Sequence, residues 1–345
     1  MPITYHQQAL CALSKQELID YFAQYGVGSG TAKAIFQNLY QKPLQDLQAI
    51  FKQHKQLDEN QLSIVLHKHA RQGAQDKSHK FLIHLNDREA IEAVRMPIEN
   101  RQSTRVTACV SSQVGCALDC SFCMTGTLDL KRNLQAWEIV EQVLLMNQVH
   151  PENRVSNVVF MGMGEPFYNY EAVKKAIEIM TDDLGLKLAR KRITVSTAGV
   201  VPRILDWAQE GKTNLAISLI CALDEKRSQL MSINERYPLN DLLSSIAHYN
   251  QKTGKKVLCE YILIENVTDG SEDVAALVKA MQGLDVTLNL IPYNENNAFV
   301  FKRPSKANIL AFRDKLRQAG LFATIRWSYG ADVAAACGQL KVQAA

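Results

Sequence analysis

Apolar residues near the start of the chain recur with the spacing of amphipathic helices. The pattern occupies three stretches, residues 14–26, 29–42 and 58–73, and acidic residues begin the third as they often begin helices. We therefore expect a small helical module over residues 1–75. His67 and His69 lie two apart on the third expected helix and would face different sides of it, so we interpret them as surface residues and not as a metal-binding pair.

The next stretch has the pattern of paired strands. Residues 79–98 contain two apolar runs that predict two strands, and the polar residues 99–104 would connect them to the rest of the chain. Residues 76–104 are therefore expected to link the helical module to a larger domain.

From Arg105 onward, apolar strands alternate with helical stretches. Strands are predicted over residues 106–111, 155–161, 192–196, 215–219, 257–263, 286–291 and 323–327. Helices are predicted over residues 137–148, 171–181, 239–253, 273–281 and 306–319. Runs such as NVVFMGMG and VTLNLIPYN are apolar on both faces, as in parallel strands covered by helices. The pattern predicts an α/β fold over residues 105–345, a partial TIM-like (βα)6 barrel of about six βα units whose chemistry lies at the carboxyl ends of its strands.

Composition and charge restrict the compartment and the partners. The chain has 345 residues, of which 47% are hydrophobic, which is ample for the cores of two domains. No uninterrupted apolar run is long enough to cross a bilayer, and the N-terminus lacks the pattern of a secretory signal, so we expect a cytoplasmic protein without a membrane partner. The formal net charge of +4 permits a nucleic-acid partner without requiring one.

The cysteines are unevenly distributed, because four of the eight lie between Cys109 and Cys123. In a reducing compartment such a group is poor material for structural disulfides and indicates metal binding or catalysis. The scattered cysteines lie in apolar surroundings, where free cysteine behaves as a small buried hydrophobe, and we assign no chemistry to Cys11, Cys221 and Cys259.

The spacing C-x3-C-x2-C joins Cys116, Cys120 and Cys123, and thiolates so close on one loop can converge on a soft metal centre. One alternative is a structural zinc site, but such a site takes four ligands and the chain has no second CxxC or HxxxH pair. A thioredoxin-like CxxC is another, and it would leave Cys116 without a role. Three thiolates suit a [4Fe–4S] cluster with one iron open to a ligand or substrate.

The cysteine loop resembles the signature of the radical S-adenosylmethionine (SAM) superfamily, in which three cysteines hold the cluster and SAM binds the fourth iron. Six motifs in order resemble the RlmN/Cfr family of RNA adenine methyltransferases. They are CVSSQVGCALDCSFC, RNL, MGMGEP, STAGVVP, IPYN and AACGQL. Each motif alone is weak, but their common order along the predicted barrel argues against chance.

The resemblance implies that SAM binds at the ends of the predicted strands. The residues that it implies for this site are Gly164, Glu165, Ser196, Ser218, Leu219, Ile220 and Asn294. The glycines before Glu165 would let the backbone approach a ligand, and the carboxylate could pair with the ammonium group of SAM. A bare glycine motif of this kind also occurs as a simple tight turn.

The resemblance also assigns catalytic roles. It implies that Cys337 is methylated by a first SAM molecule, and that a deoxyadenosyl radical from a second one then activates this methyl group for addition to the adenine ring. Cys109 would release the product by forming a transient disulfide with Cys337. Glu92 matches the proposed proton acceptor through an alignment that needs a short insertion, so an exposed glutamate without a role is an alternative.

The sequence departs from the family after the predicted strand 215–219. Family members read closer to a histidine at position 220, then Ala-Pro-Asn, and to a proline at position 232. This chain has Ile220, Cys221, Ala222, Leu223 and Ser232 at these positions. Isoleucine cannot make the polar contacts of histidine, so we expect a divergent member with intact chemistry and an altered substrate.

The resemblance implies methylation of C2 or C8 of an adenosine, in large-subunit (23S) ribosomal RNA or in transfer RNA. The protein would be a monomer reduced by a flavodoxin or ferredoxin type of donor, and its basic clusters and helical module would grip RNA phosphates. Two alternatives remain: a radical SAM enzyme with a non-RNA substrate, and an iron–sulfur or zinc protein whose cysteines only stabilise an RNA-binding module. Glu165 and Cys337 argue against the second alternative, because a structural site needs neither.

Overall fold

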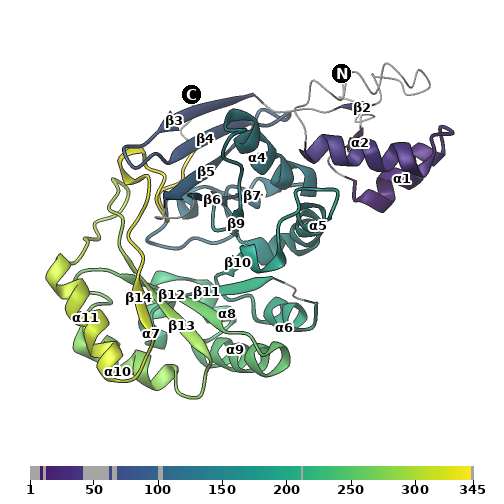
Figure 1. Cartoon of the computed structure of the whole chain (residues 1–345). Coiled ribbons are helices and arrows are strands. Elements are labelled where there is room, and N and C mark those ends of the chain that lie inside the picture. Colours follow the sequence, from purple (N-terminus) through teal and green to yellow (C-terminus); the bar gives the residue numbers. More distant parts are fainter. Residues whose placement is uncertain are drawn as a thin grey trace.

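The computed structural model describes residues 8–10, 13–41, 62–63, 68–99, 104–210 and 213–342. A curved sheet of ten strands forms the centre of this part of the chain, with helices along its outer side and the helical module beside it (Figure 1). The strand order is β14-β13-β12-β11-β10-β9-β6-β5-β4-β3. The two end strands, β14 and β3, have no partner in the described sheet beyond β13 and β4, so the barrel is open.

Seven strands of the sheet run parallel to one another. They are β6 (Thr104–Cys109), β9 (Asn157–Phe160), β10 (Ile193–Thr197), β11 (Asn214–Ile220), β12 (Val257–Leu263), β13 (Val286–Pro292) and β14 (Ala323–Ile325). The remaining strands extend the sheet antiparallel from β6, and they are β5 (Ala90–Glu99), β4 (His79–His84) and β3 (His69–Gly73). All seven predicted barrel strands and the predicted strand pair are confirmed, with ends within two residues of the prediction for the barrel strands.

A helical crossover joins each parallel strand to the next. The crossover helices are α4 (Ala136–Val149), α5 (Tyr170–Thr181), α6 (Val201–Glu210), α7 (Asp224–Leu230), α8 (Ile233–Arg236), α9 (Leu239–Thr253), α10 (Ser271–Ala280) and α11 (Lys306–Gln318). The six crossovers between β6 and β14 confirm the partial barrel that the sequence predicts. Helices α6, α7 and α8 were not predicted. No helix of the described chain is long and apolar enough to cross a membrane.

Strand β12 shows how the sequence divides the inside of the barrel from its outside. Cys259 and Tyr261 are fully buried under the helical layer, where the Tyr261 ring stacks on Phe312 of α11 with ring centres 5.6 Å apart. The alternate residues, Glu260 and Ile262, line a cavity on the inner side. A carboxylate therefore faces inward from a strand whose outer side is apolar.

The helical module contains two of the three predicted helices, α1 (Lys15–Ala23) and α2 (Ser29–Gln41). Ser14 caps α1 by accepting a hydrogen bond from Glu17 N, and the Glu17 side chain accepts one from Ser14 N in return. The module contacts the barrel through Arg154, which donates hydrogen bonds of 3.1 and 2.6 Å to the carbonyl oxygens of Gln41 and Tyr40. This contact fixes the module to the turn before β9.

The third predicted helix is wrong where the structure describes it. Residues 69–73 form the edge strand β3, with His69 opposite Ile83, and β2 (Leu62–Ser63) pairs in parallel with β1 (Gln8–Ala9). Every side chain of β3 is exposed, so the strand has no apolar face to mark it in the sequence, as is common for edge strands. His67 and Cys11 lie outside the described residues, whereas Cys221 and Cys259 are buried as predicted.

Arg227 of α7 holds the carboxyl ends of two barrel strands together. Its fully buried guanidinium donates hydrogen bonds to the carbonyl oxygens of Ala198, after β10, at 2.7 Å and of Leu219, in β11, at 3.0 Å. It also donates to Asn234 Oδ1 at 2.6 Å, and Asn234 in turn contacts Asp224. Burial lowers the pKa of Arg227 to about 10, so the side chain is still charged at neutral pH.

We expect Arg227→Met and Arg227→Lys each to lower the free energy of unfolding by about 3 kcal/mol or more, because both leave buried carbonyl groups without a donor. Arg313→Met is the control, since Arg313 makes an exposed pair with Asp314 on α11 that is worth about 1 kcal/mol or less. Chemical unfolding of the full chain measures both. Equal stability of the Arg227 and Arg313 variants would contradict the role of Arg227.

Candidate active site

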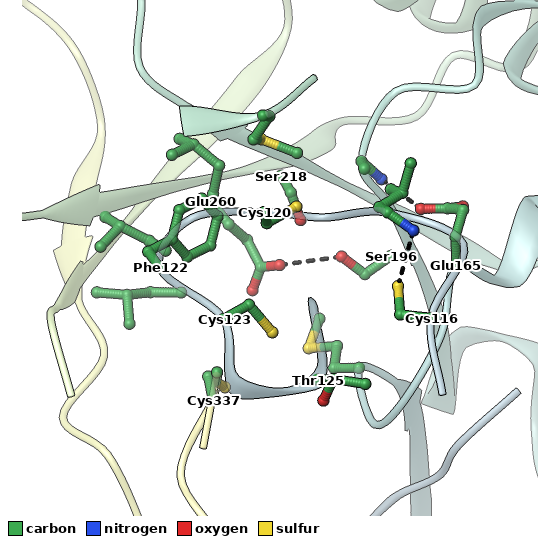
Figure 2. Close-up of a pocket in the computed structure, with 18 of the residues that line it drawn as sticks. Cys116, Cys120, Phe122, Cys123, Thr125, Glu165, Ser196, Ser218, Glu260 and Cys337 are labelled. Atoms are coloured by element: carbon green, nitrogen blue, oxygen red, sulfur yellow. Dashed lines mark hydrogen bonds between the residues drawn. The ribbon is translucent and has the colours of Figure 1, made fainter. Parts of the chain in front are cut away.

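A cavity lies inside the barrel at the carboxyl ends of the parallel strands (Figure 2). It encloses about 970 Å³ of empty space, counting its open mouth. Most of the residues singled out from the sequence line it, and these are Cys116, Cys120, Cys123, Gly164, Glu165, Ser196, Ser218, Ile220, Asn294 and Cys337. Leu219, Cys109 and Glu92 do not line it.

The cysteine loop is held in place by its own turns and by the end of the chain. Cys123 N donates to Cys120 O at 3.1 Å, which begins the short helical turn η2 (Met124–Thr127). Met124 N donates to Gly338 O at 2.8 Å, and the Thr125 hydroxyl donates to Leu340 O at 2.6 Å. The C-terminal segment is thereby fixed against the loop, which places Cys337 beside the cysteine cluster.

The three thiols of the loop are arranged around one end of the cavity (Figure 2). Burial, together with the charges of neighbouring thiols, raises the pKa of Cys116 to about 12 and that of Cys120 well above its usual value. These thiols therefore keep their protons unless a metal centre is bound, because its positive charge would stabilise the thiolates in place of the protons. No three Cys, His, Asp or Glu side chains among the described residues are grouped closely enough to hold one metal ion. A [4Fe–4S] cluster spreads its thiolate ligands over different irons, and a soft, three-thiol donor set facing an open cavity fits it.

The GMGE segment approaches the cysteine loop more closely than any larger residue would allow. Gly164 has a φ of +95°, and a Cβ atom on it would lie 2.5 Å from the Cβ atom of Gln113. Its backbone N–H donates to the sulfur of Cys116. A Cβ atom on Gly162 would lie 2.7 Å from Val110 O. The glycines are therefore required by close backbone contact and by a positive φ, and not only by a tight turn.

Glu165 is a buried carboxylate at the end of β9. Oε1 accepts a hydrogen bond from Phe167 N at 2.9 Å, and Oε2 accepts one from Ala198 N at 2.7 Å. Burial raises the pKa of Glu165 to about 7 in spite of these bonds. A cationic ligand in the cavity would favour the ionised form, as expected for a residue that pairs with an ammonium group.

The strand ends on the other side of the cavity contribute a second buried carboxylate that the sequence analysis did not identify. Ser196 Oγ of β10 donates to Glu260 Oε2 of β12 at 3.0 Å (Figure 2). Asn294 Nδ2 donates to Cys337 O at 3.0 Å, and Arg303 Nη2 donates to Asn294 Oδ1 at 2.7 Å. Asn294 therefore contacts the cavity and the C-terminal segment together.

Strand β11 ends in a strained turn at the place where the sequence departs from the family. Cys221 N donates to Leu219 O at 2.7 Å across Ile220, whose φ is +65°, which is rare for a β-branched residue. The turn directs Ile220 to the cavity, whereas Leu219 is fully buried and contributes only its carbonyl to Arg227. Ser232 hydrogen-bonds Asp119 of the cysteine loop.

Cys109 lies in a second, smaller cavity of about 440 Å³ next to the first. Cys337 and Met161 line both cavities, and Arg326 lines the second. Cys109 and Cys337 are both free thiols in the structure, so the predicted disulfide is not present. The fold nevertheless brings these two cysteines, from opposite ends of the barrel sequence, to one cavity.

Glu92 is buried, so the alternative of an exposed glutamate is wrong. Oε1 lies 3.1 Å from Lys80 Nζ, and Oε2 accepts a hydrogen bond from Lys341 N at 2.9 Å. Glu92 thereby joins β5 to β4 and to the C-terminal segment. It lines neither of the two cavities, and its role in proton transfer stays a prediction.

Three charged residues in or beside the site belong to none of the sequence motifs, and they are Arg227, Glu260 and Arg326. Glu260 is the acidic residue within the apolar run VLCEYIL, and Arg326 follows the short apolar run of β14. A charge inside a strand that is otherwise buried on both faces is a usable signal, because such a charge needs a partner or a ligand.

Comparison with known proteins agrees with this geometry. A family model described as the radical SAM superfamily matches residues 110–278. The chain is 38% identical over 333 residues to the dual-specificity RNA methyltransferase RlmN of Syntrophobacter fumaroxidans, covering 94% of this chain and 95% of that protein. It is 38% identical over 346 residues to the probable RlmN of Staphylococcus saprophyticus, covering 98% and 94%. A crystal structure of a radical SAM methyltransferase from Sphaerobacter thermophilus superposes with a TM-score of 0.90 at 38% identity, covering 97% of this chain and 99% of that one.

We expect Gly164→Ala to lower the free energy of unfolding by about 2–4 kcal/mol, from backbone strain together with the clash against Gln113. The control is Gly254→Ala, because Gly254 also has a positive φ, +64°, but has open space where its Cβ atom would lie. Its cost should be that of the backbone strain alone, about 1–2 kcal/mol. Thermal and chemical unfolding give the comparison, and equal losses would mean that the contact with Gln113 relaxes freely.

Proposed function

This chain belongs to the RlmN family of radical SAM RNA methyltransferases, and from that premise we propose that it methylates C2 or C8 of an adenosine in RNA through an S-methylated Cys337. The observation that carries this proposal is the position of Cys337. Its side chain lines the cavity of the three loop cysteines and, on the other side, the cavity that contains Cys109. In the proposed reaction the Cys337 sulfur must reach first the methyl donor and later the resolving thiol Cys109, and Cys337 lines the cavity proposed for each.

The cofactors of the family, a [4Fe–4S] cluster and SAM, would be held at the cysteine loop and the strand ends. Cys116, Cys120 and Cys123 would bind the cluster, which supplies an electron for the cleavage of SAM. Phe122 and Thr125 of the same loop also line the cavity. The backbone donors at Gly164 and Gly126 already face Cys116 and Cys123, and such hydrogen bonds favour thiolates.

The polar groups at the strand ends would orient SAM. Glu165 would pair with the ammonium group of the methionine moiety, and Ser196, Ser218 and Asn294 would contribute hydrogen bonds from three other strand ends. Ile220 would contribute an apolar surface. Leu219 would act only through its backbone, because its side chain is fully buried away from the cavity.

Cys337 and Cys109 would carry out the transfer in turn. The sulfur of Cys337 would accept a methyl group, and the carbon would then be linked to both Cys337 and the adenine. Cys109 would attack the Cys337 sulfur, forming a disulfide and leaving the methyl group on the base. Glu92 would accept the proton that the ring carbon loses, once the Lys341 N–H that now binds its Oε2 is replaced by substrate.

The finer features of the substrate and partners rest on the family resemblance. Large-subunit ribosomal RNA is the favoured substrate and transfer RNA the second. In either RNA the target would be an unpaired adenosine, because paired bases are not accessible to the enzyme. The enzyme would work as a cytoplasmic monomer, with a flavodoxin or ferredoxin type of electron donor. The helical module and the basic clusters of the sequence, residues 131–133, 187–192, 254–256 and 301–304, would hold RNA phosphates.

A second candidate is a radical SAM enzyme that acts on a substrate other than RNA. The observation that favours it is the replacement of the family's histidine and asparagine by Ile220 and Leu223 at and after the strained end of β11. The first of these side chains faces the cavity, so the change lies in the site and not on a distant surface.

Loss of any loop cysteine should prevent cluster binding. We expect Cys120→Ala, after anaerobic reconstitution, to bind much less iron and sulfide than the unmodified protein and to lose the visible absorption of the cluster. Cys259→Ala is the control, because this buried cysteine faces the helical layer and not the cavity. Iron content near the unmodified level in the Cys120 variant would remove the loop as the cluster site.

Deletion of the gene should remove one methyladenosine from ribosomal or transfer RNA, as measured by nucleoside mass spectrometry on the two pools separately. A plasmid with the unmodified gene should restore it, and Cys337→Ala should not, because the methyl carrier is absent. Cys109→Ala should accumulate a covalent protein–RNA adduct that the double variant with Cys337→Ala lacks.

Retention against C2 and C8 standards would identify the carbon. If neither RNA pool changes on deletion or overproduction, the proposed RNA substrate is wrong. If the product forms in Cys337→Ala, the methyl-cysteine route is wrong while the family activity remains.

A further inference from the structure

The cavity of Cys109 and Cys337 contains one cationic side chain, Arg326, among its lining residues. Arg326 follows β14, lines this cavity and exposes about a quarter of its side chain. The rest of the lining is mostly apolar or small, and it includes Met96, Ile291, Ala335 and Leu340. A guanidinium in such surroundings acts strongly on any nearby ionisable group, because little water screens it.

Two contacts hold the guanidinium in place. Nη1 lies 3.4 Å from Glu260 Oε1, and it lies 3.3 Å from the sulfur of Met161. Glu260 is itself buried and accepts the hydrogen bond of Ser196 at 3.0 Å on its other oxygen. A chain of polar contacts therefore runs from Ser196, on the wall of the larger cavity, through Glu260 to Arg326 in the smaller one.

Cys109 needs help to become a nucleophile, because only the thiolate attacks sulfur. Burial, together with the charges of Cys337 and Glu260, raises the pKa of Cys109 to about 12. Arg326 and the backbone N–H of Met161 act in the opposite direction. In return, the charges of Cys337, Glu260 and Cys109 raise the pKa of Arg326 in spite of its burial, so it stays a cation.

We propose that Arg326 is the residue that makes Cys109 nucleophilic, and that the negative charge of Glu260 limits the size of its effect. This inference rests on the proposed function, because it assigns a role in the release step of that reaction. Arg326 acts through Cys109 and is therefore a positioning residue. No sequence motif marks Arg326, but it lines the same cavity as Cys109 and Cys337.

The release step can be written with all atoms and electrons placed. Cys109 first loses its proton to solvent, and the resulting thiolate remains beside the Arg326 guanidinium. The thiolate then attacks the Cys337 sulfur, so that an S–S bond forms while the bond from this sulfur to the methylene carbon breaks. The electron pair of the broken bond leaves on the carbon, which takes a proton from water and becomes the methyl group. A dithiol reductant would afterwards return the disulfide to two thiols.

The test is the pH dependence of Cys109 alkylation by iodoacetamide in the cluster-loaded protein, read from mass spectra of peptides that contain Cys109. It needs neither RNA nor methyl transfer. Arg326→Gln should move the profile to higher pH, and the rate below the pKa should fall about tenfold for each pH unit of the shift. Arg326→Lys should keep much of the alkylation rate, because lysine retains the positive charge although it lacks the planar guanidinium group.

Glu260→Gln gives the matched variant of opposite sign. Removing this carboxylate removes a charge that opposes the Cys109 thiolate, so the profile should move to lower pH and the rate should rise. Damage to packing alone would shift both variants in the same direction. Cys221, which is buried beside Asp273 and Lys226 and lines neither cavity, is the internal reference thiol, and Arg313→Gln is the control for loss of a surface arginine.

Opposite shifts of Cys109 in the two variants, with an unchanged Cys221 profile and unchanged circular dichroism, support the inference. An unchanged Cys109 profile in Arg326→Gln, or shifts of the same sign in both variants, overturns it. The outcome is separate from that of the proposed function. A chain that methylates no RNA but shows opposite shifts refutes the function alone, and an active methyltransferase without the shifts refutes the inference alone.

Discussion

The attachment of the C-terminal segment to the cysteine loop is the constraint on which the rest of the site depends. Two hydrogen bonds to its backbone fix it, from Met124 N to Gly338 O at 2.8 Å and from the Thr125 hydroxyl to Leu340 O at 2.6 Å. Asn294 and Glu92 add hydrogen bonds to Cys337 O and Lys341 N from opposite sides of the barrel. Because both cavities are completed by this segment, its position decides whether the three loop thiols, Cys337 and Cys109 form one site or several unrelated ones.

The inside of the barrel contains charged groups that a purely structural core would avoid. Glu165 and Glu260 are buried carboxylates, and Arg227 is a buried guanidinium whose hydrogen-bonding partners are mainly backbone carbonyl groups. Removing such charges from water is unfavourable unless hydrogen bonds and counter-charges replace the solvent. Each of the three has such bonds. Glu165 and Glu260 line the larger cavity, and Arg227 binds carbonyl groups at the carboxyl ends of β10 and β11. The unfavourable burial is therefore concentrated at the place where ligands would bind.

Two residues near this edge of the sheet have positive φ angles, and one of them is strained. Gly164 and Ile220 both have positive φ angles, and both stand at the ends of strands that line the cavity. Gly164 adopts this conformation without a steric penalty, whereas Ile220 is held in it by the short hydrogen bond across its turn and by Arg227 on the preceding carbonyl. Arg227 thus stabilises both the junction of β10 with β11 and the strained turn that follows it.

The sequence by itself determined the barrel, because apolar periodicity is a local property and the buried parallel strands carry it strongly. It also determined the spacing of the three loop cysteines and, by resemblance, most of the predicted site residues that line the cavity. Strand β3 was missed, since an edge strand with only exposed side chains has no local pattern and exists through its pairing with β4. Tertiary structure alone decided the contacts of Arg227, Glu260 and Arg326, the burial of Glu92, and the shared cavity of Cys109 and Cys337. These depend on which strands become neighbours and on how burial changes the energy of a charge, and neither is encoded in the spacing of residues along the chain.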